Sequence, residues 1–406
     1  MTAARPPESG VPRHERLLGV LCAATFLVFF QAFMVAPLLP LLSRAFGASP
    51  QAVALAVPAY MIPYGVSTLF YGLVSDRLGR RRIVLGSLLA FSVLTALTAS
   101  AQSGGELVLW RLLTGLGASG VVPLALALVG QLYPFERRGR PLGWLFGAMA
   151  GGMAFGSSFG ALLEPLVGWR AIFLGVGGLG LLVFALLLPY RGLLGEPTRE
   201  TAPPLRQVLT GYATLLGSPR GLATYGFVFV NSVFHAGVFT WLGLYFSERH
   251  GLGEVGIGLA LLGYGVPGFL LGPVIGRAAD RWGRRWLIPA GLAAGAAGAA
   301  GLILDLPLLA AAAAVTVLSL GYDMTQPLLA GIVTDLGGKR PGQAMGLNVF
   351  TLFTGMGVGS VIFGEALRLG FGPALGVFTV VQFAGAILAI GLFHAERTPR
   401  PTPGAG

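Results

Sequence analysis

The spacing of the charged residues constrains the fold more than any other feature of the sequence. Twelve stretches of about 20 residues or more contain no Asp, Glu, Lys or Arg, apart from one aspartate in one of them. A helix that crosses a bilayer needs about 20 apolar residues, because each residue advances it by about 1.5 Å. The stretches are 17–43, 45–75, 83–105, 112–135, 141–163, 171–190, 221–247, 255–276, 286–304, 341–364, 369–395 and 306–334, which Asp323 interrupts. The pattern predicts an all-α membrane protein with twelve transmembrane helices.

The same scarcity of charge excludes a soluble fold. Charged residues make up 11% of the 406 residues, whereas soluble domains carry about 25%. A membrane β-barrel would show alternating segments of about ten residues, and the sequence contains none. The expected surroundings are therefore the lipid bilayer.

The basic residues predict which side of the membrane each connection faces. The chain has 27 lysines and arginines, and one of them, Arg111, lies within a span. With the N-terminus inside, nearly all of the others fall in inner connections; the outer ones are Arg44, Arg170, Arg249 and Arg368. Inner connections carry such an excess, so we expect both termini in the cytoplasm and a multi-pass protein of the inner (cytoplasmic) membrane. The scattered arginines also account for the net charge of +11 without a nucleic-acid partner.

One long connection divides the spans into six and six. Residues 191–219 contain Pro197, Pro203, Pro204 and Pro219, and such a linker lets two halves move relative to each other. The expected organisation is a cytoplasmic tail, a six-helix bundle, a cytoplasmic linker, a second six-helix bundle and a cytoplasmic tail, over 1–15, 16–190, 191–219, 220–395 and 396–406.

The two halves share a repeated motif. GLVSDRLGRR begins at Gly72 and GRAADRWGRR begins at Gly276, 204 residues later, and six of the ten positions are identical. The same offset places Phe159-Gly160 on Phe363-Gly364. Parallel repeats of this kind are typical of secondary transporters built from two halves. We therefore predict two pseudo-symmetric six-helix bundles.

These motifs resemble those of the major facilitator superfamily (MFS) over about 16–395. The stretch Gly72–Arg82 matches that family's signature between its second and third helices, and LVLWRLLTGLGASG resembles the fourth-helix signature with its single arginine, Arg111. FMVAPLLP is similar to the first helix of twelve-span efflux members, although Gln31 stands near the place where many of those carry an acid.

A fifth-helix motif points to the drug and proton antiporter branch. GAMAGGMAFGSSFGALL resembles that branch's glycine-rich signature, but Ser157 follows Gly156 where a proline usually stands. Small residues let membrane helices approach closely. The expected helix-packing glycines are Gly147, Gly151, Gly152, Gly156 and Gly160.

The resemblance implies a gate in the repeated motif. Gly79 permits a turn with positive φ, and an acid at a helix end is suited to an ion pair or to capping a helix N-terminus. The family likeness implies that Asp76, repeated as Asp280, latches the two halves on the inner side; the alternative is that it only reduces local repulsion. The gating set is Gly72, Asp76, Arg77, Gly79, Arg80, Arg81, Gly276, Asp280, Arg281, Gly283 and Arg284.

Two charges inside spans are candidates for proton coupling, together with a histidine. A buried intramembrane charge costs several kcal/mol (about 2.5–3.5 on insertion scales) and marks a functional site by default. Arg111 lies about five residues from an outer end, so snorkelling to the surface is its alternative. Asp323 lies mid-span, and Pro327 predicts a local helix break there; its alternative is a packing role. His235, halfway along the seventh span, completes the set.

The substrate is expected to bind between the halves. The repeat offset places Gln31 of the first span on His235 of the seventh, and the MFS resemblance implies that these two spans line a central cavity. The candidate substrate-binding residues are Gln31, Asn231, His235, Tyr264, Asp323, Gln326 and Asn348, with Tyr60 and Tyr64 as weaker ones. The alternative for each of them is a structural role, in which its side chain only packs or hydrogen-bonds one helix to another.

The function predicted from the sequence is secondary active transport of a small organic molecule by alternating access, with proton-coupled efflux favoured. An uncoupled facilitator or a proton-coupled importer of the same fold is the alternative, and a transport-inactive sensor is a more remote one. No catalytic constellation, phosphate-binding loop or metal-spaced cluster stands out, so no enzyme activity, cofactor or metal is expected. The partners expected are the substrate, protons and the lipid bilayer, with the chain a monomer.

Overall fold

The computed structural model describes residues 11–133, 137, 139–194, 205–338 and 341–396, together with their side chains except at a few positions within helices. Every element in these ranges is helical, as predicted for the fold class. The first half contains α1 (Val11–Phe33), η2 (Ala36–Leu38), α2 (Leu39–Phe46), α3 (Pro50–Ala54), α4 (Ala56–Leu78), α5 (Arg80–Thr98), α6 (Gly104–Ala118), α7 (Val121–Leu132), α8 (Gly139–Val167), α9 (Trp169–Leu187) and η4 (Leu188–Tyr190).

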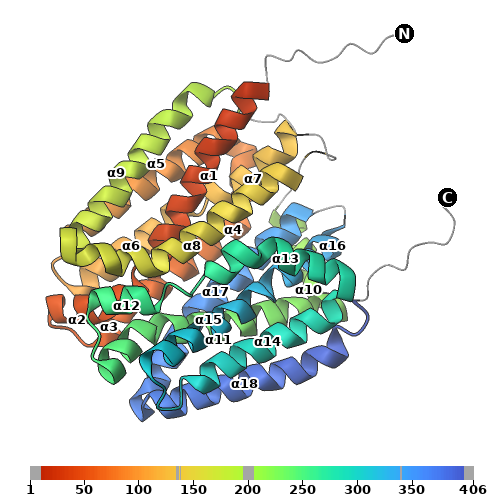
Figure 1. Ribbon diagram of the computed structural model, residues 1–406. Coiled ribbons are helices and arrows are strands. Elements are labelled where there is room, and N and C mark those ends of the chain that lie inside the picture. Colours follow the sequence, from red (N-terminus) through yellow and green to blue (C-terminus); the bar gives the residue numbers. More distant parts are fainter. Residues whose placement is uncertain (1–10, 134–136, 138, 195–204, 339–340, 397–406) are drawn as a thin grey trace, which may run out of the picture.

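The second half follows one short helix, α10 (Leu205–Gly217), which occupies part of the predicted linker. It contains α11 (Pro219–His250), α12 (Glu254–Ala260), α13 (Val266–Trp282), α14 (Arg284–Gly301), α15 (Leu308–Asp323), α16 (Gln326–Gly337), α17 (Pro341–Ala366), η5 (Leu367–Leu369) and α18 (Phe371–Leu392). The halves form two bundles that lie side by side, the first in red to yellow and the second in green to blue (Figure 1).

In the described residues, ten helical segments are long and apolar enough to cross a membrane. They correspond to ten of the twelve predicted spans. The two others are the segment of α12 and α13, which is split into a 7-residue and a 17-residue helix, and α14, which has 18 residues and begins with Arg284 and Arg285. A split helix presents no long apolar run, so length and composition alone do not mark it as a span.

Several of the predicted spans are interrupted, among them the second, at Leu55 between α3 and α4. The first changes from α1 to η2 and α2 near Pro37, and the eighth is interrupted at 261–265, where Gly265 has φ of 84°. The fourth is interrupted between Ala118 and Val121, and the tenth between Asp323 and Gln326. The last break confirms the one predicted from Pro327, because a proline cannot donate the hydrogen bond that a continuous helix requires. The breaks in the fourth and tenth spans lie at equivalent places of the repeat.

Glycines allow the closest helix contacts in the first half. A Cβ at Gly152 or Gly156 would overlap the backbone carbonyl of Phe26 or Phe30 in α1, and one at Gly160 would lie 3.1 Å from Met34. These three glycines are spaced by four and therefore share one face of α8. Gly151 is buried, whereas a Cβ at Gly147 would meet nothing within 4 Å. The face of α8 that ends at Gly160 thus sets the distance between α1 and α8.

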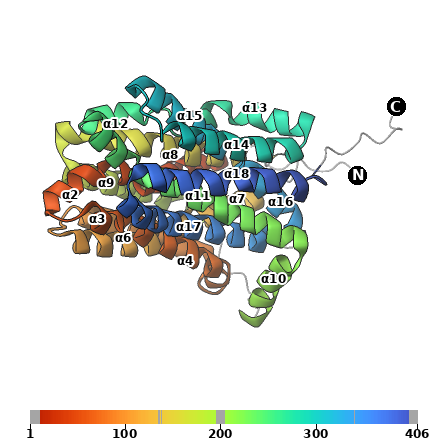
Figure 2. The same ribbon diagram turned by 90° about the horizontal axis from the view of Figure 1, so that it is seen from below.

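The two ends of the molecule differ in charge. One end carries the α4–α5 and α13–α14 connections with their arginines, and it also holds the described chain ends Val11 and Glu396 (Figures 1 and 2). We call it the arginine-rich end. Both connections turn at a glycine of positive φ, 87° at Gly79 and 80° at Gly283, as predicted for Gly79. The opposite end carries α2, α3 and α12 (Figures 1 and 2).

Candidate functional site

The contact surface between the two bundles, called here the seam, is made by several helices of each half. Helix α4 packs against α17, α8 against α12 and α13, and α11 against η2 and α2. Where they meet, a Cβ at Gly265 would overlap Ala154, and one at Gly357 would press on Ile62. Glycines thus bring helices of the two halves close together at these points.

Aromatic rings line the seam near its middle. Tyr64 of α4 stacks on Phe353 of α17 with ring centroids 4.3 Å apart, and Phe33 of α1 lies 5.7 Å from Phe239 of α11. Phe239 in turn stacks on Tyr264 at 4.3 Å. Tyr264 was among the predicted substrate residues and Tyr64 was a weaker candidate. The phenylalanines were missed, because a phenylalanine inside an apolar span carries no signal that separates a seam position from a lipid-facing one.

Arg111 is fully buried and bound to backbone carbonyls. Its Nη1 donates to Gln31 O at 3.1 Å, its Nη2 to Ala32 O at 3.3 Å and its Nε to Ala56 O at 3.1 Å. The guanidinium also lies over the Tyr60 ring, 4.3 Å from its centroid. Its side chain is 0% exposed, so the snorkelling alternative is wrong.

The reason for this arrangement lies in the interrupted first span. Because α1 ends at Phe33, the carbonyls of its last turn lack the amides that a continuing helix would supply. The planar guanidinium reaches two of them at once, and its third donor reaches Ala56 at the start of α4. Arg111 thus joins α6 to α1 and α4 at the break. Its position relative to these helices could not be read from the sequence, since its acceptors lie 55 to 80 residues earlier in the chain.

Asp323 lies where two interrupted spans meet. It is the last residue of α15, and its carboxylate accepts the backbone N–H of Gly268 in the first turn of α13. Ser319 Oγ lies 3.4 Å from Asp323 Oδ2 and accepts the Gly265 N–H at 2.8 Å. A carboxylate at a helix N-terminus satisfies free amides and faces the positive end of the helix dipole. Unlike Arg111, Asp323 is partly exposed.

Two predicted substrate residues belong to a hydrogen-bond network inside the second bundle. Asn231 Nδ2 donates to Thr325 Oγ1 at 2.7 Å, and its Oδ1 accepts from Gln382 Nε2 at 2.8 Å. Gln326 Nε2 donates to Ser232 Oγ at 3.1 Å. The network joins α11, α16 and α18 at the break after Asp323, and it does not include Gln31.

Three other predicted substrate residues are buried, and their side chains have polar atoms without a hydrogen-bond partner among the described residues. They are Gln31 (Nε2 and Oε1), His235 (both ring nitrogens) and Asn348 (Oδ1). Buried polar groups are nearly always paired, so these atoms are available to a further partner. The His235 ring packs 5.1 Å from Tyr322 and against Gly295, which places it among α11, α14 and α15.

The predicted latch lies partly outside the described side chains. Nothing is described of Asp76 or Asp280 beyond their helical backbones, nor of the surroundings of Gly72 and Gly276. Of the other members of the set, Arg77, Arg81 and Arg281 are exposed, while Arg80 and Arg284 are half-buried; Gly79 and Gly283 are buried. The pairing of the aspartates with arginines stays a prediction.

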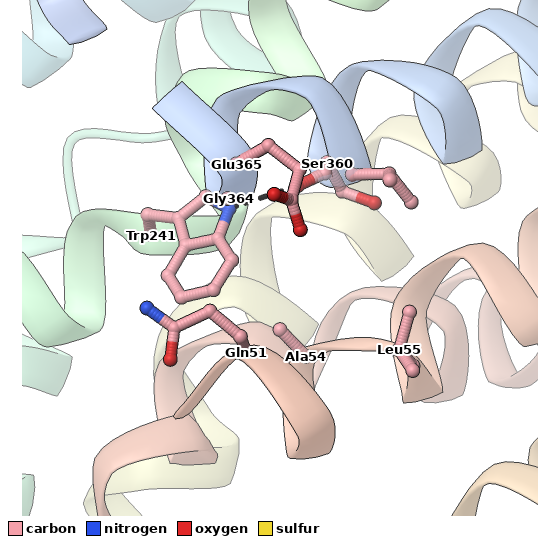
Figure 3. Close-up of a pocket in the computed structure, with 8 residues that line it drawn as sticks. Gln51, Ala54, Leu55, Trp241, Ser360, Gly364 and Glu365 are labelled. Carbon is pink, nitrogen blue, oxygen red and sulfur yellow. Dashed lines mark hydrogen bonds between the residues drawn. The ribbon is translucent and has the colours of Figure 1, made fainter. Parts of the chain in front are cut away.

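Contacts between the halves also occur at the opposite end. Arg44 of α2 forms an ion pair with Glu254 of α12, and Gly243 of α11 packs on Pro37. Beside them, Trp241 Nε1 donates to Ser360 O at 3.0 Å. Figure 3 shows this tryptophan facing Gln51 of α3 across a small cavity of about 30 Å³ that Ala54 and Glu365 also line. The ion pair was missed, since each partner reads alone as a charge on an outer loop.

Helix α10 touches both halves near the arginine-rich end. Tyr212 Oη donates to Leu69 O of α4 at 3.0 Å, and Gln343 Nε2 of α17 donates to Val208 O at 2.6 Å. Burial raises the pKa of the Tyr212 hydroxyl above its usual range, so it keeps its proton and remains a donor. The predicted linker therefore includes a helix that holds α4 and α17 together.

Comparison with known proteins agrees with this architecture. The family model described as Major Facilitator Superfamily matches residues 21–270 and 250–406. The uncharacterized MFS-type transporter YwfA of Bacillus subtilis is 24% identical over 381 residues, which cover 92% of this chain and 90% of that protein. An MFS-type efflux pump of Mycolicibacterium smegmatis is 29% identical over 241 residues, 56% of this chain and 54% of the pump. The crystal structure of a D-xylose-proton symporter has a TM-score of 0.74 at 16% identity, with 92% and 97% of the two chains covered.

Proposed function

Because this chain belongs to the Major Facilitator Superfamily, and so is a multi-pass membrane transporter, we propose that it exports a small organic molecule by alternating access, driven by protons. The single observation that carries the coupling is Asp323. It is a partly exposed carboxylate at the meeting point of two interrupted spans, bonded to Gly268 and Ser319. Intramembrane acids of this kind are the usual proton carriers of transporters.

The proposed orientation puts the arginine-rich end in the cytoplasm. The excess of basic residues at that end supports it. The pair α12–α13 and the helix α14 then complete twelve spans, with the break at 261–265 covered by α8 and α15. In this orientation the contacts of Arg44, Glu254 and Trp241 close the external side, and the substrate enters from the cytoplasm.

The substrate is proposed to bind at the middle of the seam. The rings of Tyr64, Phe353, Phe239 and Tyr264 favour a largely apolar or aromatic molecule, since offset and edge-on ring contacts each add about 0.5–1.5 kcal/mol beyond the buried area. The unpaired amide of Gln31 would bind a polar group of that molecule. Direction is supported by the relative named as an efflux pump.

A change in the protonation of Asp323 would act on the break itself. As a carboxylate, it accepts the Gly268 N–H and stabilises the first turn of α13. Once protonated, it loses its charge, and the attraction to the α13 N-terminus weakens. Helices α13 and α15 would then separate more easily, which couples the proton to the movement of α13 along α8 in the seam.

The test is transport in proteoliposomes, with ethidium, D-xylose and citrate as probes. Transport of at least one probe that accelerates with an imposed pH gradient is expected for the wild type, and Asp323→Asn should remove the acceleration while keeping slow, gradient-independent movement. Glu365→Gln is the matched control, since Glu365 is an exposed acid whose ion-pair partner among the described residues is Arg368.

Two outcomes would reject parts of this proposal. Equal rates with and without the gradient, in wild type and Asp323→Asn alike, would show an uncoupled facilitator. If none of the probes moves, export of these classes of molecule is ruled out.

A further inference from the structure

An open groove lies at the arginine-rich end of the second bundle, away from the seam. Its volume is about 590 Å³, and it is formed by the end of α13, the start of α14 and the break between α15 and α16. The lining residues are Arg281, Trp282, Arg285, Trp286, Leu287, Ala290 and Met324. The transport cycle proposed above gives this groove no role.

The groove has a charged part and an apolar part. Arg281 and Arg285 supply two guanidinium groups, and neither forms an ion pair with an acid among the described residues. Glu396 lies beside the groove, because its backbone carbonyl accepts the Arg285 N–H at 3.2 Å. Its carboxylate, however, forms an ion pair with Arg220 at 2.7 Å. Helix α14 begins at Arg284 with no acidic residue in its first turn, so its N-terminus adds further positive potential.

Two tryptophans form the walls beyond the arginines. Trp282 is 60% and Trp286 is 52% exposed, and the Arg285 guanidinium lies 5.1 Å from the Trp286 ring. Leu287, Ala290 and Met324 continue the apolar lining toward the middle of the bundle. Tryptophan is enriched where a membrane protein meets the headgroup layer. From the arginine-rich end inward, the groove is therefore lined first by charged groups, then by amphipathic rings, and then by aliphatic side chains.

We propose that this groove binds an anionic glycerophospholipid. The phosphate lies between Arg281 and Arg285, the glycerol ester region lies against the two tryptophan rings, and one acyl chain follows Ala290 and Met324. Arginine recognises phosphate through charge-assisted hydrogen bonds, and basic pockets between transmembrane helices bind anionic headgroups. Inorganic phosphate would use the same two arginines but would leave the tryptophan and aliphatic walls uncovered.

The internal repeat supplies a natural comparison. The residues 204 positions earlier keep both arginines, as Arg77 and Arg81, but have Leu78 and Arg82 in place of the two tryptophans. If positive charge alone attracted the lipid, the earlier copy, with Arg82 as an additional arginine, would bind it at least as tightly. The groove with the tryptophans is therefore expected to bind more tightly than its counterpart.

The test measures lipid binding to the purified full-length chain by native mass spectrometry. Delipidated protein is titrated with dioleoylphosphatidylglycerol, with dioleoylphosphatidylethanolamine, or with phosphatidylglycerol in the presence of millimolar inorganic phosphate. We expect Arg281→Gln/Arg285→Gln to weaken the tightest phosphatidylglycerol site about 30-fold. The matched control, Arg77→Gln/Arg81→Gln, should change it less than twofold.

A second variant and a second readout test the location of the lipid. Trp282→Leu/Trp286→Leu keeps both arginines and should still weaken phosphatidylglycerol several-fold. Brominated phosphatidylglycerol should quench a larger share of the fluorescence of the wild type than of this variant.

The proposal is overturned if both arginine pairs affect binding equally, or if phosphatidylethanolamine binds as tightly as phosphatidylglycerol. It is likewise overturned if inorganic phosphate displaces the lipid, which would reveal a free-phosphate site. Should the arginine variant not fold, unchanged binding by the tryptophan variant would suffice to reject it.

Discussion

At the scale of single residues, Arg111 shows how a charge is kept inside the bilayer without an acid. Its three hydrogen bonds go to carbonyls at the end of α1 and the start of α4. A lysine in its place has one compact ammonium group and a different reach, so it cannot span the three acceptors. Among the described residues, Arg111 therefore stabilises the interruption of the first span by binding the free carbonyls there.

We predict that Arg111→Lys destabilises the protein by about 3 kcal/mol or more, because two hydrogen bonds from a charged group are lost at roughly 1.5–3 kcal/mol each. Unfolding in mixed micelles by increasing SDS fraction measures this loss. Arg170→Lys is the control, since exposed Arg170 also lies over an aromatic ring, that of Trp169, but donates to one carbonyl, Ala101 O at 3.0 Å. Equal losses in the two variants would contradict the role given to Arg111.

At the scale of elements, the distance between α1 and α8 depends on glycines spaced by four. A Cβ at Gly156 would overlap the Phe30 carbonyl and lie 3.0 Å from Phe30 Cα, and backbone cannot move aside as a side chain can. Phe30 lies just before the carbonyls that Arg111 binds. A displaced α1 would therefore disturb that site too.

We expect Gly156→Ala to lower the thermal unfolding midpoint in detergent, despite the higher helix propensity of alanine. Overpacking of a close contact costs about 1–3 kcal/mol. Gly147→Ala, on the same helix with nothing within 4 Å of its Cβ, should be neutral or stabilising. A stabilised Gly156→Ala protein would show that the contact is not tight.

The helical elements themselves follow from the sequence, but their faces do not. The charge-free runs were enough to predict an all-helical fold, and the repeated motif was enough to predict the family. Pro327 predicted the break after Asp323. The directions of Asn231 and His235 could not be derived. Helix α11 is buried on almost every side between Phe234 and Phe246, and a helix that is apolar all round has no periodicity from which to read a face. Contacts across 200 residues, such as Arg44 with Glu254, have no local signal at all.

At the scale of the whole molecule, the Arg44–Glu254 ion pair ties the two bundles together at the opposite end. Arg44 is 62% and Glu254 20% exposed in their side chains, so the pair contributes about 0.2–1 kcal/mol. That amount changes an equilibrium between closed and open states without abolishing either. Such a contact is suited to a gate that must open in every cycle.

We predict that Glu254→Gln increases opening at this end roughly 1.4- to 5-fold, which is 0.2–1 kcal/mol expressed as a population ratio. A cysteine at buried Ala54, in a Cys22→Ser background, reports the opening through its rate of labelling by an impermeant maleimide. Arg44→Glu/Glu254→Arg should restore slow labelling. Asp305→Asn, which removes a pair within the second half, should leave the rate unchanged; if it does not, general surface charge is responsible.

The hydrogen-bond partners of Arg111 also bear on how the chain enters the membrane. Gln31, Ala32 and Ala56 all precede Arg111, and Gly268 and Ser319 precede Asp323. Synthesis proceeds from the N-terminus, so each intramembrane charge leaves the ribosome after the groups that bind it. The translocon therefore need not hold an unpaired ion until a later helix arrives. Neutral groups such as the amide of Asn231 do wait for partners, here Thr325 and Gln382, that are made after them.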